Sequence, residues 1–319
     1  MSDRAGVGDR VVGCVLGLAL GDALGAPFEF QRAHSIPDPL PAFERPWLGL
    51  PPGSTTDDTA MAMNLVRSLA EHGELDPEDV AERHVAWLAT EPPDVGNLTR
   101  RVLSRVAKGE VTAPEAARAV WEERGPEVSA GNGSVMYCAP LGAAYANRRT
   151  ELLDAAPAMS AITHYDERCR TAVLAVTLAV AALVRGEGPA AALEDAIGTT
   201  IDLEGGEELE FLVGGAGVAR PIDGPDQGFV LFTAGLGLQA LHRASDHGAI
   251  EVAAFERELR RVVSLGGDTD TNAAVAGTLL GAGAGASNLP RDWLGKLRGR
   301  DEIEREAERL VPLAEFGAP

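Results

Sequence analysis

The segment TAVLAVTLAVAALVRG (171–186) indicates the fold class of this chain. It is apolar nearly all round when it is projected onto a helix. A surface helix would show one polar face, so a helix of this kind has to be enclosed by other elements. We therefore predict a central buried helix over 167–186, with the rest of the chain packed around it.

Helical periodicity continues on both sides of this segment, and no convincing alternating strand pattern accompanies it. Some helix starts carry caps, such as Asp76-Pro77 and the capping-box spacing of Thr112 and Glu115. The sequence predicts an all-α fold with helices at roughly 8–25, 58–73, 77–90, 97–109, 113–123, 135–147, 151–160, 167–186, 189–201, 229–243, 250–263, 270–283 and 301–313.

Two irregular segments interrupt these helices. The Pro-rich stretch 31–56 is long for a compact domain, which is typical of a functional loop such as a lid, or of an insertion. The second segment, about 217–228, is shorter, and neither has the composition of a linker. We expect a compact single domain over 1–319. Gly215-Ala216-Gly217 follows no strand and lacks the last glycine of a dinucleotide fingerprint, so we interpret it as a helix terminus.

The composition excludes several classes of protein. Hydrophobic residues make up 45% of the chain and charged residues 24%, as in ordinary globular domains. The formal net charge of −20 disfavours nucleic acid as a partner, because it repels a phosphate backbone. The 3 cysteines form no CxxC pair, so neither a zinc site nor a disulfide framework is indicated. This usage fits a reducing compartment, and we expect a cytoplasmic protein.

The apolar run over 11–20 resembles a signal peptide only loosely. Asp3 and Asp9 lie among the basic residues before it, and Asp22 follows it closely. The run is also shorter than the roughly 20 residues that span a bilayer. We predict a buried first helix and no membrane association.

Two segments place Asp and Thr side chains together at the start of an apolar helix. STTDDT (54–59) leads into AMAMNLVRSLAEHG, and GGDTDTN (266–272) leads into AAVAGTLLGAGAG. Either segment alone could be a helix cap, because Asp and Thr are favoured there. Each, however, holds more acidic and hydroxyl groups than a cap needs. Gly266-Gly267 also permits an irregular backbone that can aim several side chains at one point.

Carboxylate and hydroxyl oxygens are the ligands that hard divalent cations prefer. Four Asp and two Thr from two helix starts could hold two ions about 3.5–4 Å apart, as in two-metal hydrolases. Without cations, four crowded carboxylates would repel one another. The hypothesis of a two-ion site therefore requires the two segments to meet in the fold.

Three further features admit a functional and a structural interpretation. Glu29 follows Ala26-Pro27-Phe28 at a helix end, where it could exchange protons or be a solvated loop acid. The backbone amides of 131–134 (GNGS) could bind an anion, or form an Asn-Gly turn. His164 could donate to a ribose hydroxyl, or serve as a capping or core histidine.

These motifs, in this order, resemble the ADP-ribosylglycohydrolase family from Gly13 to about Leu297. The resemblance rests on GCVLGLALGDALGAPFEF (13–30), Thr56-Asp57-Asp58, GNGSVM (131–136) with APLG (139–142), THYD (163–166), GGDTDTNAAVAGTLLGA (266–282) and NLPRDWLGKL (288–297).

The resemblance implies an all-helical hydrolase with two Mg²⁺ or Mn²⁺ ions that cleaves a glycosidic bond to ADP-ribose. It implies catalytic roles for Glu29 and Asp268 and a contact of His164 with the ribose. The Gly131, Asn132, Gly133 and Ser134 loop would contact the diphosphate or distal ribose, and Phe229 the base. The implied metal ligands are Thr56, Asp57, Asp58, Asp268, Asp270 and Thr271.

Two positions depart from the family pattern. Tyr137 stands where arginine is common, and Phe229 stands where tyrosine or tryptophan is frequent. Both departures concern the leaving group and the base rather than the metal site.

The expected substrate is an ADP-ribosylated protein, with arginine as the first candidate linkage and serine as the second. The alternatives are hydrolysis of a small ADP-ribose derivative or a phosphorylated metabolite, and a non-catalytic crystallin-like protein on the same scaffold. The last alternative would need broken metal ligands, and none of the six is broken here.

Overall fold

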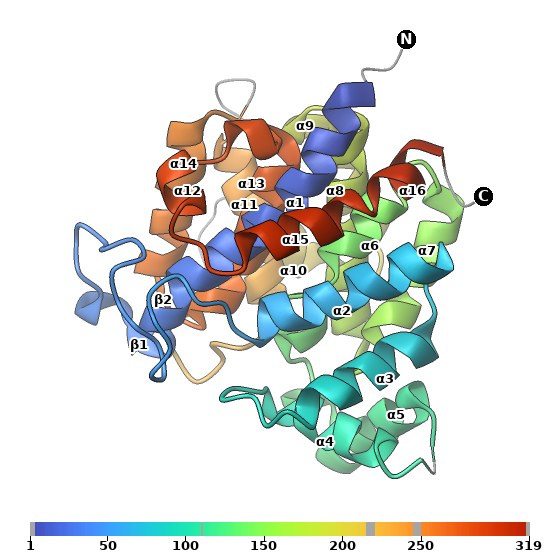
Figure 1. The fold of residues 1–319 in the computed structure, drawn as a ribbon. Coiled ribbons are helices and arrows are strands. Elements are labelled where there is room, and N and C mark those ends of the chain that lie inside the picture. The colour runs from blue at the N-terminus through green and yellow to red at the C-terminus, as the bar shows by residue number, and fades with distance from the viewer. Residues whose placement is uncertain (1–3, 110, 215–220, 245–249, 317–319) are drawn as a thin grey trace.

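The chain is helical along most of its length, which confirms the all-α prediction (Figure 1). The structure is a computed structural model and describes residues 4–109, 111–214, 221–244 and 250–316. Within these residues the strands are β1 (Gln31–Arg32) and β2 (Gly266–Gly267). The α-helices are α1 (Arg4–Gly25), α2 (Asp57–His72), α3 (Pro77–Leu88), α4 (Asn97–Val106), α5 (Ala113–Arg124), α6 (Ala139–Ala144), α7 (Arg149–Ser160), α8 (Glu167–Arg185), α9 (Pro189–Thr200), α10 (Gly206–Val213), α11 (Val230–Ala244), α12 (Val252–Ser264), α13 (Thr269–Ala284), α14 (Arg291–Leu294), α15 (Arg300–Glu308) and α16 (Val311–Phe316).

Most predicted helices are present within a few residues of their expected bounds, and the differences have local causes. The helix expected over 135–147 is reduced to α6, because a 3-10 turn (Asn132–Ser134) precedes it and Pro140 lies in its first turn. The helix expected over 301–313 divides into α15 and α16, and Pro312 stands at the start of the second. The short helices α10 and α14 and the two-residue antiparallel ladder of β1 and β2 carry no periodic signal, so the sequence does not reveal them.

Helix α8 is the enclosed helix that the sequence predicts. Its side chains from Thr171 to Val184 are all buried, and it contacts α6, α7, α9, α11 and α13. Asp166 caps its N-terminus by accepting a hydrogen bond from the backbone N–H of Arg168, and Gly186 ends it in a left-handed conformation. The residues immediately before α8, which include His164, are thereby attached to a rigid support.

Helices α1 and α13 pack antiparallel with their backbones in contact. A Cβ added to Gly21 of α1 would overlap the carbonyl oxygen of Ala273, because no space separates the two helices there. At the end of this contact, Gly25 meets Thr269 at the start of α13. The contact depends on glycines at every fourth position of α1, which are Gly13, Gly17, Gly21 and Gly25.

The buried first helix that the sequence predicts is confirmed. Among the described residues, one segment, Gly6–Phe28, is long and apolar enough to cross a membrane, and 94% of its most apolar window is buried inside the protein. The length argument drawn from the 11–20 run was therefore wrong, since α1 extends well beyond that run. Burial in the core, rather than shortness, accounts for its apolar composition.

We expect Gly21→Ala to destabilise the protein by about 3 kcal/mol, the upper end for an overpacked core site, because the new methyl group meets backbone atoms. Gly198→Ala in α9 is the matched control, since a Cβ there has no atom within 4 Å. Alanine is favoured over glycine inside a helix by roughly 0.5–1 kcal/mol, so the control gains stability. Urea unfolding compares the two variants, and equal midpoints would contradict the packing of α1 on α13.

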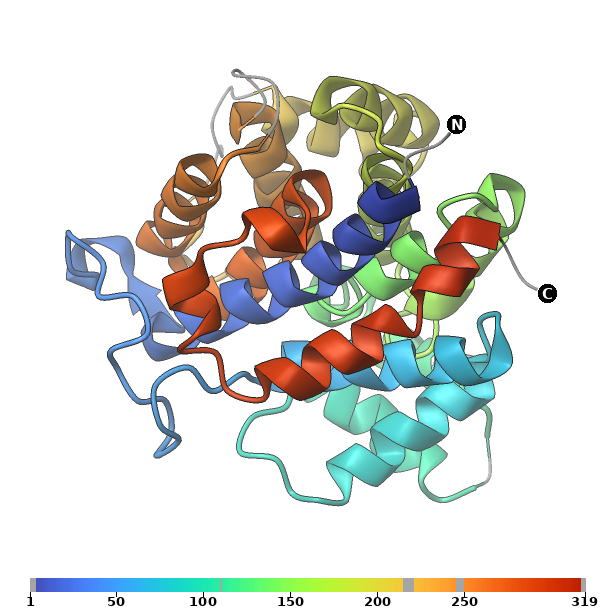
Figure 2. The ribbon, with the colours of Figure 1, turned by 45° about the horizontal axis from the view of Figure 1, so that its top comes forward.

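The Pro-rich segment 31–56 packs against the C-terminal helices. The Arg260 side chain of α12 donates to the carbonyl of Leu40 at 2.6 Å, and the ring of Phe43 lies 5.4 Å from that of Trp293 in α14. Figures 1 and 2 show α3, α4 and α5 as a layer next to α2, on the side of α2 that faces away from α15. The start of α2 lies between these two regions.

One large hydrophobic cluster joins side chains from α1 to α16. The assignment of residues 1–319 to a single domain nevertheless stays a prediction. The helix terminus expected at 215–217 lies outside the described residues, as does part of the loop expected at 217–228.

Candidate active site

The two Asp-Thr segments, which lie far apart in the sequence, meet in the structure. The hydroxyl of Thr271 donates to Oδ2 of Asp58 at 3.3 Å, and the hydroxyl of Thr56 donates to the same oxygen at 3.2 Å. Both segments lie at helix N-termini, of α2 and α13, where the helix dipole favours negative charge. The contact that the metal-site hypothesis requires is therefore present. The four carboxylates of these segments are buried, and they belong to Asp57, Asp58, Asp268 and Asp270.

Asp22 of α1 holds the first of these segments in place. Its carboxylate accepts hydrogen bonds from the backbone N–H groups of Thr56 and Thr59, at 3.0 and 3.1 Å, and from the Thr59 hydroxyl. Burial raises the pKa of Asp22 to about 6, although these hydrogen bonds oppose the shift. The sequence reasoning assigned Asp22 no role at the site, yet an Asp inside an otherwise apolar helix was a usable signal.

Glu29 is joined to the second segment through the small sheet. The backbone N–H of Phe30 donates to the carbonyl of Gly267 at 2.7 Å, and β1 pairs with β2 directly after it. Gly267 has φ +76°, and a Cβ there would lie 2.5 Å from the carbonyl oxygen of Ile222. The indole N–H of Trp47, from the 31–56 segment, donates to the Glu29 carboxylate at 3.3 Å. Glu29 is thus attached both to this loop and to the start of α13.

Burial and crowding raise the pKa of several carboxyl groups at this site. The pKa of Asp57 rises to about 8, mainly through burial and then through the neighbouring carboxylate of Asp94. The same two causes raise the pKa of Glu29 to about 8. The pKa values of Asp58 and Asp270 also lie well above their usual range, chiefly through burial. Opposite charge within the cluster would favour the ionised forms.

Some oxygens of the cluster have no partner in the described part of the protein. Oδ1 of Asp58 and Oδ1 of Asp270 are buried and accept no hydrogen bond there. Glu29, Asp94 and Asp270 each offer an oxygen, and these oxygens lie within 4.8 Å of one another. Such a donor set fits hard divalent cations. Asp94 lies in the loop between α3 and α4, where no motif or helix start marks it, so the sequence reasoning missed it.

A cavity of about 580 Å³ opens beside the carboxylates. Thr56, Asp58 and Ser134 do not line it, although Thr56 and Asp58 belong to the cluster next to it. The predicted site residues that line the cavity are Glu29, Asp57, Gly131, Asn132, Gly133, His164, Phe229, Asp268, Asp270 and Thr271.

The glycine loop is tied both to the carboxylate cluster and to the Phe229 segment. The Asn132 side chain donates to Oδ2 of Asp268 at 2.9 Å and to the hydroxyl of Thr233 at 3.0 Å. Gly131 forms an isolated antiparallel bridge with Phe229. One wall of the cavity is therefore a continuous hydrogen-bonded unit.

His164 packs against this loop. A Cβ on Gly133 would lie 2.6 Å from the imidazole Cε1, and one on Gly131 would lie 3.3 Å from Nε2. The other ring nitrogen, Nδ1, shares a hydrogen bond of 2.9 Å with the Thr163 hydroxyl. Burial lowers the pKa of His164 to about 4, so the ring is neutral at physiological pH. A neutral imidazole is suited to a sugar hydroxyl rather than to pairing with a phosphate charge.

Ser134 is buried away from the cavity. Its hydroxyl accepts a hydrogen bond of 3.0 Å from the hydroxyl of Ser160. The substrate contact predicted for Ser134 therefore receives no support from its side chain.

The family model described as ADP-ribosylglycohydrolase matches residues 3–317. The chain belongs to the ADP-ribosylglycohydrolase family.

Several relatives match over nearly the whole chain. The ADP-ribosyl-(dinitrogen reductase) glycohydrolase of Rhodospirillum rubrum is 34% identical over 97% of this chain and 97% of its own length. The ADP-ribosylhydrolase ARH3 of Gallus gallus is 29% identical, covering 95% of this chain and 93% of that protein. The ADP-ribosylarginine hydrolase Tri1 of Serratia proteamaculans is 26% identical, covering 96% of this chain and 80% of that protein. A solved structure titled ADP-ribosylglycohydrolase-related protein complex superposes with a TM-score of 0.79 at 34% identity, covering 97% of this chain and 99% of that one.

These relatives confirm the expected class of enzyme, the ADP-ribosylglycohydrolases, as well as the fold. The two departures from the family pattern occupy different environments. Tyr137 is fully buried, and its hydroxyl lies 3.3 Å from that of Thr163, so it lies beneath the glycine loop rather than in the cavity. Phe229 lines the cavity, with its ring centroid 5.2 Å from that of Phe232. Only the change at Phe229 can therefore meet a ligand directly.

Proposed function

We propose that this protein hydrolyses the glycosidic bond between ADP-ribose and a modified arginine side chain of a protein, with two Mg²⁺ or Mn²⁺ ions as cofactors. The observation that carries the proposal is the meeting of the two Asp-Thr segments beside a cavity whose wall is the glycine loop. The cavity has the size typical of small-molecule sites, roughly 300–1,000 Å³.

The residues proposed to hold the cations come from both segments. When bound, such cations supply positive charge that polarises hydroxyl oxygens and lowers the pKa of a water molecule. The hydrogen bond from Asn132 to Asp268 orients that carboxylate, as a second layer of contacts commonly does around a metal ligand. The proposed ligands are Thr56, Asp57, Asp58, Asp268, Asp270 and Thr271.

Glu29 and the cavity wall have separate tasks in this proposal. Glu29, half-buried at the edge of the cluster, transfers a proton as the glycosidic bond breaks through an oxocarbenium-like state. Neutral His164 contacts a ribose hydroxyl, and the amides of Gly131 and Gly133 approach the diphosphate. Asp268, a further carboxylate of the cluster, assists the proton transfer.

The charge of the cavity favours arginine over serine as the leaving group. Carboxylates outnumber basic side chains in its lining, and Asp94 lies half-buried among them without belonging to either Asp-Thr segment. A guanidinium is planar, cationic and suited to a carboxylate partner, whereas a serine hydroxyl brings no charge. A relative named for ADP-ribosylarginine supports the same choice.

The test measures ADP-ribose released from arginine-linked and serine-linked peptides in the presence of Mg²⁺ or Mn²⁺. We expect Asp94→Asn to lower release from the arginine-linked peptide about 10- to 100-fold, the effect of losing one hydrogen bond to a charged group. Asp94 is not among the proposed ligands, so Mn²⁺ affinity, measured by calorimetry, should stay within about threefold of wild type. A larger loss of Mn²⁺ affinity would instead make Asp94 a metal ligand, as its closeness to Glu29 and Asp270 also allows.

Three outcomes would count against this proposal. No release by the wild type from either peptide would reject the function. Equal losses on both peptides would reject the pairing of Asp94 with guanidinium. Release of phosphate from small phosphorylated metabolites, with none of ADP-ribose, would favour a phosphoesterase instead.

Divalent cations should stabilise the protein more strongly as the pH rises. Without cations, Asp57 and Glu29 have a pKa of about 8 in the folded chain, above their usual values of roughly 4, so the folded state binds more protons between these limits. The stability of the metal-free protein therefore falls as pH rises from about 4 to about 8. Melting temperatures with chelator and with Mg²⁺ at about pH 5 and about pH 8 test this. An Mg²⁺ effect that shrinks towards high pH would contradict it.

We also propose that the protein is cytoplasmic. The described cysteines, Cys14, Cys138 and Cys169, are free and buried, which suits the reducing cytoplasm that the sequence suggests.

A further inference from the structure

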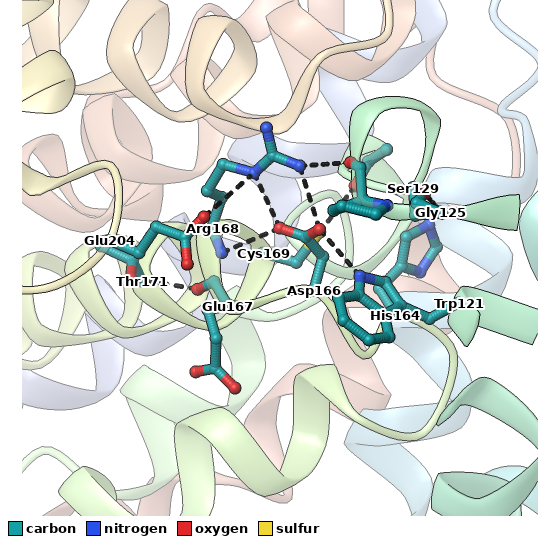
Figure 3. A network of polar contacts seen from close by, with 12 residues as sticks. Trp121, Gly125, Ser129, His164, Asp166, Glu167, Arg168, Cys169, Thr171 and Glu204 are labelled. Carbon is teal, nitrogen blue, oxygen red and sulfur yellow. Dashed lines mark hydrogen bonds and ion pairs between the residues drawn. The ribbon is translucent and has the colours of Figure 1, made fainter. Parts of the chain in front are cut away.

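Arg168 is held in a fixed orientation by the network of Figure 3. Its Nε and Nη2 donate to the two carboxylate oxygens of Asp166, at 2.8 and 3.0 Å, in the fork geometry typical of arginine. Nη2 also donates to the carbonyl of Pro126. The Asp166 carboxylate is buried and receives a further hydrogen bond of 3.0 Å from the indole of Trp121. The guanidinium is therefore held by Asp166 and by the carbonyl of Pro126, and Trp121 holds Asp166 in turn.

This fixed cation lines the same cavity as the carboxylate cluster. Its Cζ lies 5.7 Å from the centroid of the Phe229 ring, and the next residue, Cys169, donates to the carbonyl of Gly131 at 3.3 Å. Arg168 thus stands beside the glycine loop and next to Phe229. Within the described residues its Nη1 donates no hydrogen bond, so that group remains available to a ligand.

The distribution of charge in the cavity indicates which kind of ligand group Arg168 could bind. Its described lining is strongly acidic, and Arg124 and Arg168 are the two basic side chains there, since His164 is neutral. Both arginines donate to carbonyls of the turn at 126–128, so the two positive side chains lie at one end of the cavity. Two carboxylates accompany them there, since Glu127 also lines the cavity and Glu204 lies 3.9 Å from Nε of Arg168. A ligand with a diphosphate would be repelled by the carboxylates and attracted to this end.

On the basis of the proposed function, we infer that Arg168 binds the diphosphate of the ADP-ribosyl group through Nη1. Asp166 and Trp121 keep the guanidinium in position before the substrate arrives, which reduces the entropy lost on binding. The structural alternative is that Arg168 only supports Phe229 and the 126–128 turn. The two roles predict different affinities: a diphosphate-binding Arg168 affects the binding of ADP but not of adenosine, whereas a supporting Arg168 affects both equally.

The test measures the affinity of ADP and of adenosine for the full chain by calorimetry in the presence of Mg²⁺. Arg168→Met should weaken ADP binding about 10- to 100-fold, the effect of losing a hydrogen bond to a charged group, and change adenosine binding less than about threefold. Arg168→Lys keeps the positive charge but loses the fork geometry, so its ADP affinity should lie between those of the wild type and Arg168→Met. Arg170→Met on the same helix is the matched control, because Arg170 pairs with Glu167 and does not line the cavity.

Equal losses for ADP and adenosine would overturn the inference and leave Arg168 a support for Phe229. Unchanged ADP affinity, or a wild type that binds neither probe, would overturn it as well. The outcome is separate from that of the proposed function. A wild type that binds ADP through Arg168 but releases no ADP-ribose would reject the reaction and retain the binding role.

Discussion

Asp268→Asn is expected to reduce ADP-ribose release about 1,000-fold, as roughly 4 kcal/mol of transition-state stabilisation is lost. The substitution keeps the size of the side chain and an oxygen that can accept the hydrogen bond from Asn132. It removes one negative charge from a buried site that we propose to hold two divalent cations. Mn²⁺ binding should therefore weaken together with activity.

A matched control is available on the surface. Asp154→Asn removes the same charge from an exposed position on α7 and should leave both release and Mn²⁺ affinity unchanged. If Asp268→Asn retained more than about a tenth of wild-type release, the metal-site assignment would be wrong, because losing a ligand costs more than tenfold.

Glu29→Gln should lower kcat about 100- to 10,000-fold, the range for loss of a general acid or base, with little change in KM. Glutamine keeps an acceptor for the indole N–H of Trp47, so the local structure is retained. Because Glu29 lies at the edge of the cluster, we expect Mn²⁺ to bind this variant with nearly wild-type stoichiometry. The combination of lost turnover and retained metal would identify a proton-transfer role.

Glu44→Gln is the control for this prediction, since Glu44 lies exposed in the same 31–56 segment. Glu29→Gln with kcat within about threefold of wild type would exclude the proton-transfer role. Loss of Mn²⁺ binding comparable to that of Asp268→Asn would instead make Glu29 a metal ligand, as its closeness to Asp94 and Asp270 also allows.

The residues that sequence reasoning missed share one property. Asp22 acts on Thr56, 34 positions away, and Trp47 reaches Glu29 across 18 positions. Nothing in the local pattern around either residue indicates its partner. Asp94 and Arg168 were missed for the same reason, since their positions in the cavity depend on where other segments fold.

The sequence by itself determined the helices, the enclosed character of α8 and the two Asp-Thr helix starts, because periodicity, capping and apolar composition act over one or two turns. It also carried the ordered motifs of the family. Tertiary structure alone decided that Thr271 reaches Asp58 across 213 positions of the chain. Beside that contact, α1 and α13 approach until glycine and backbone touch, which brings Gly25 to Thr269. Contacts of this range are produced by packing between helices, and a local pattern cannot specify them.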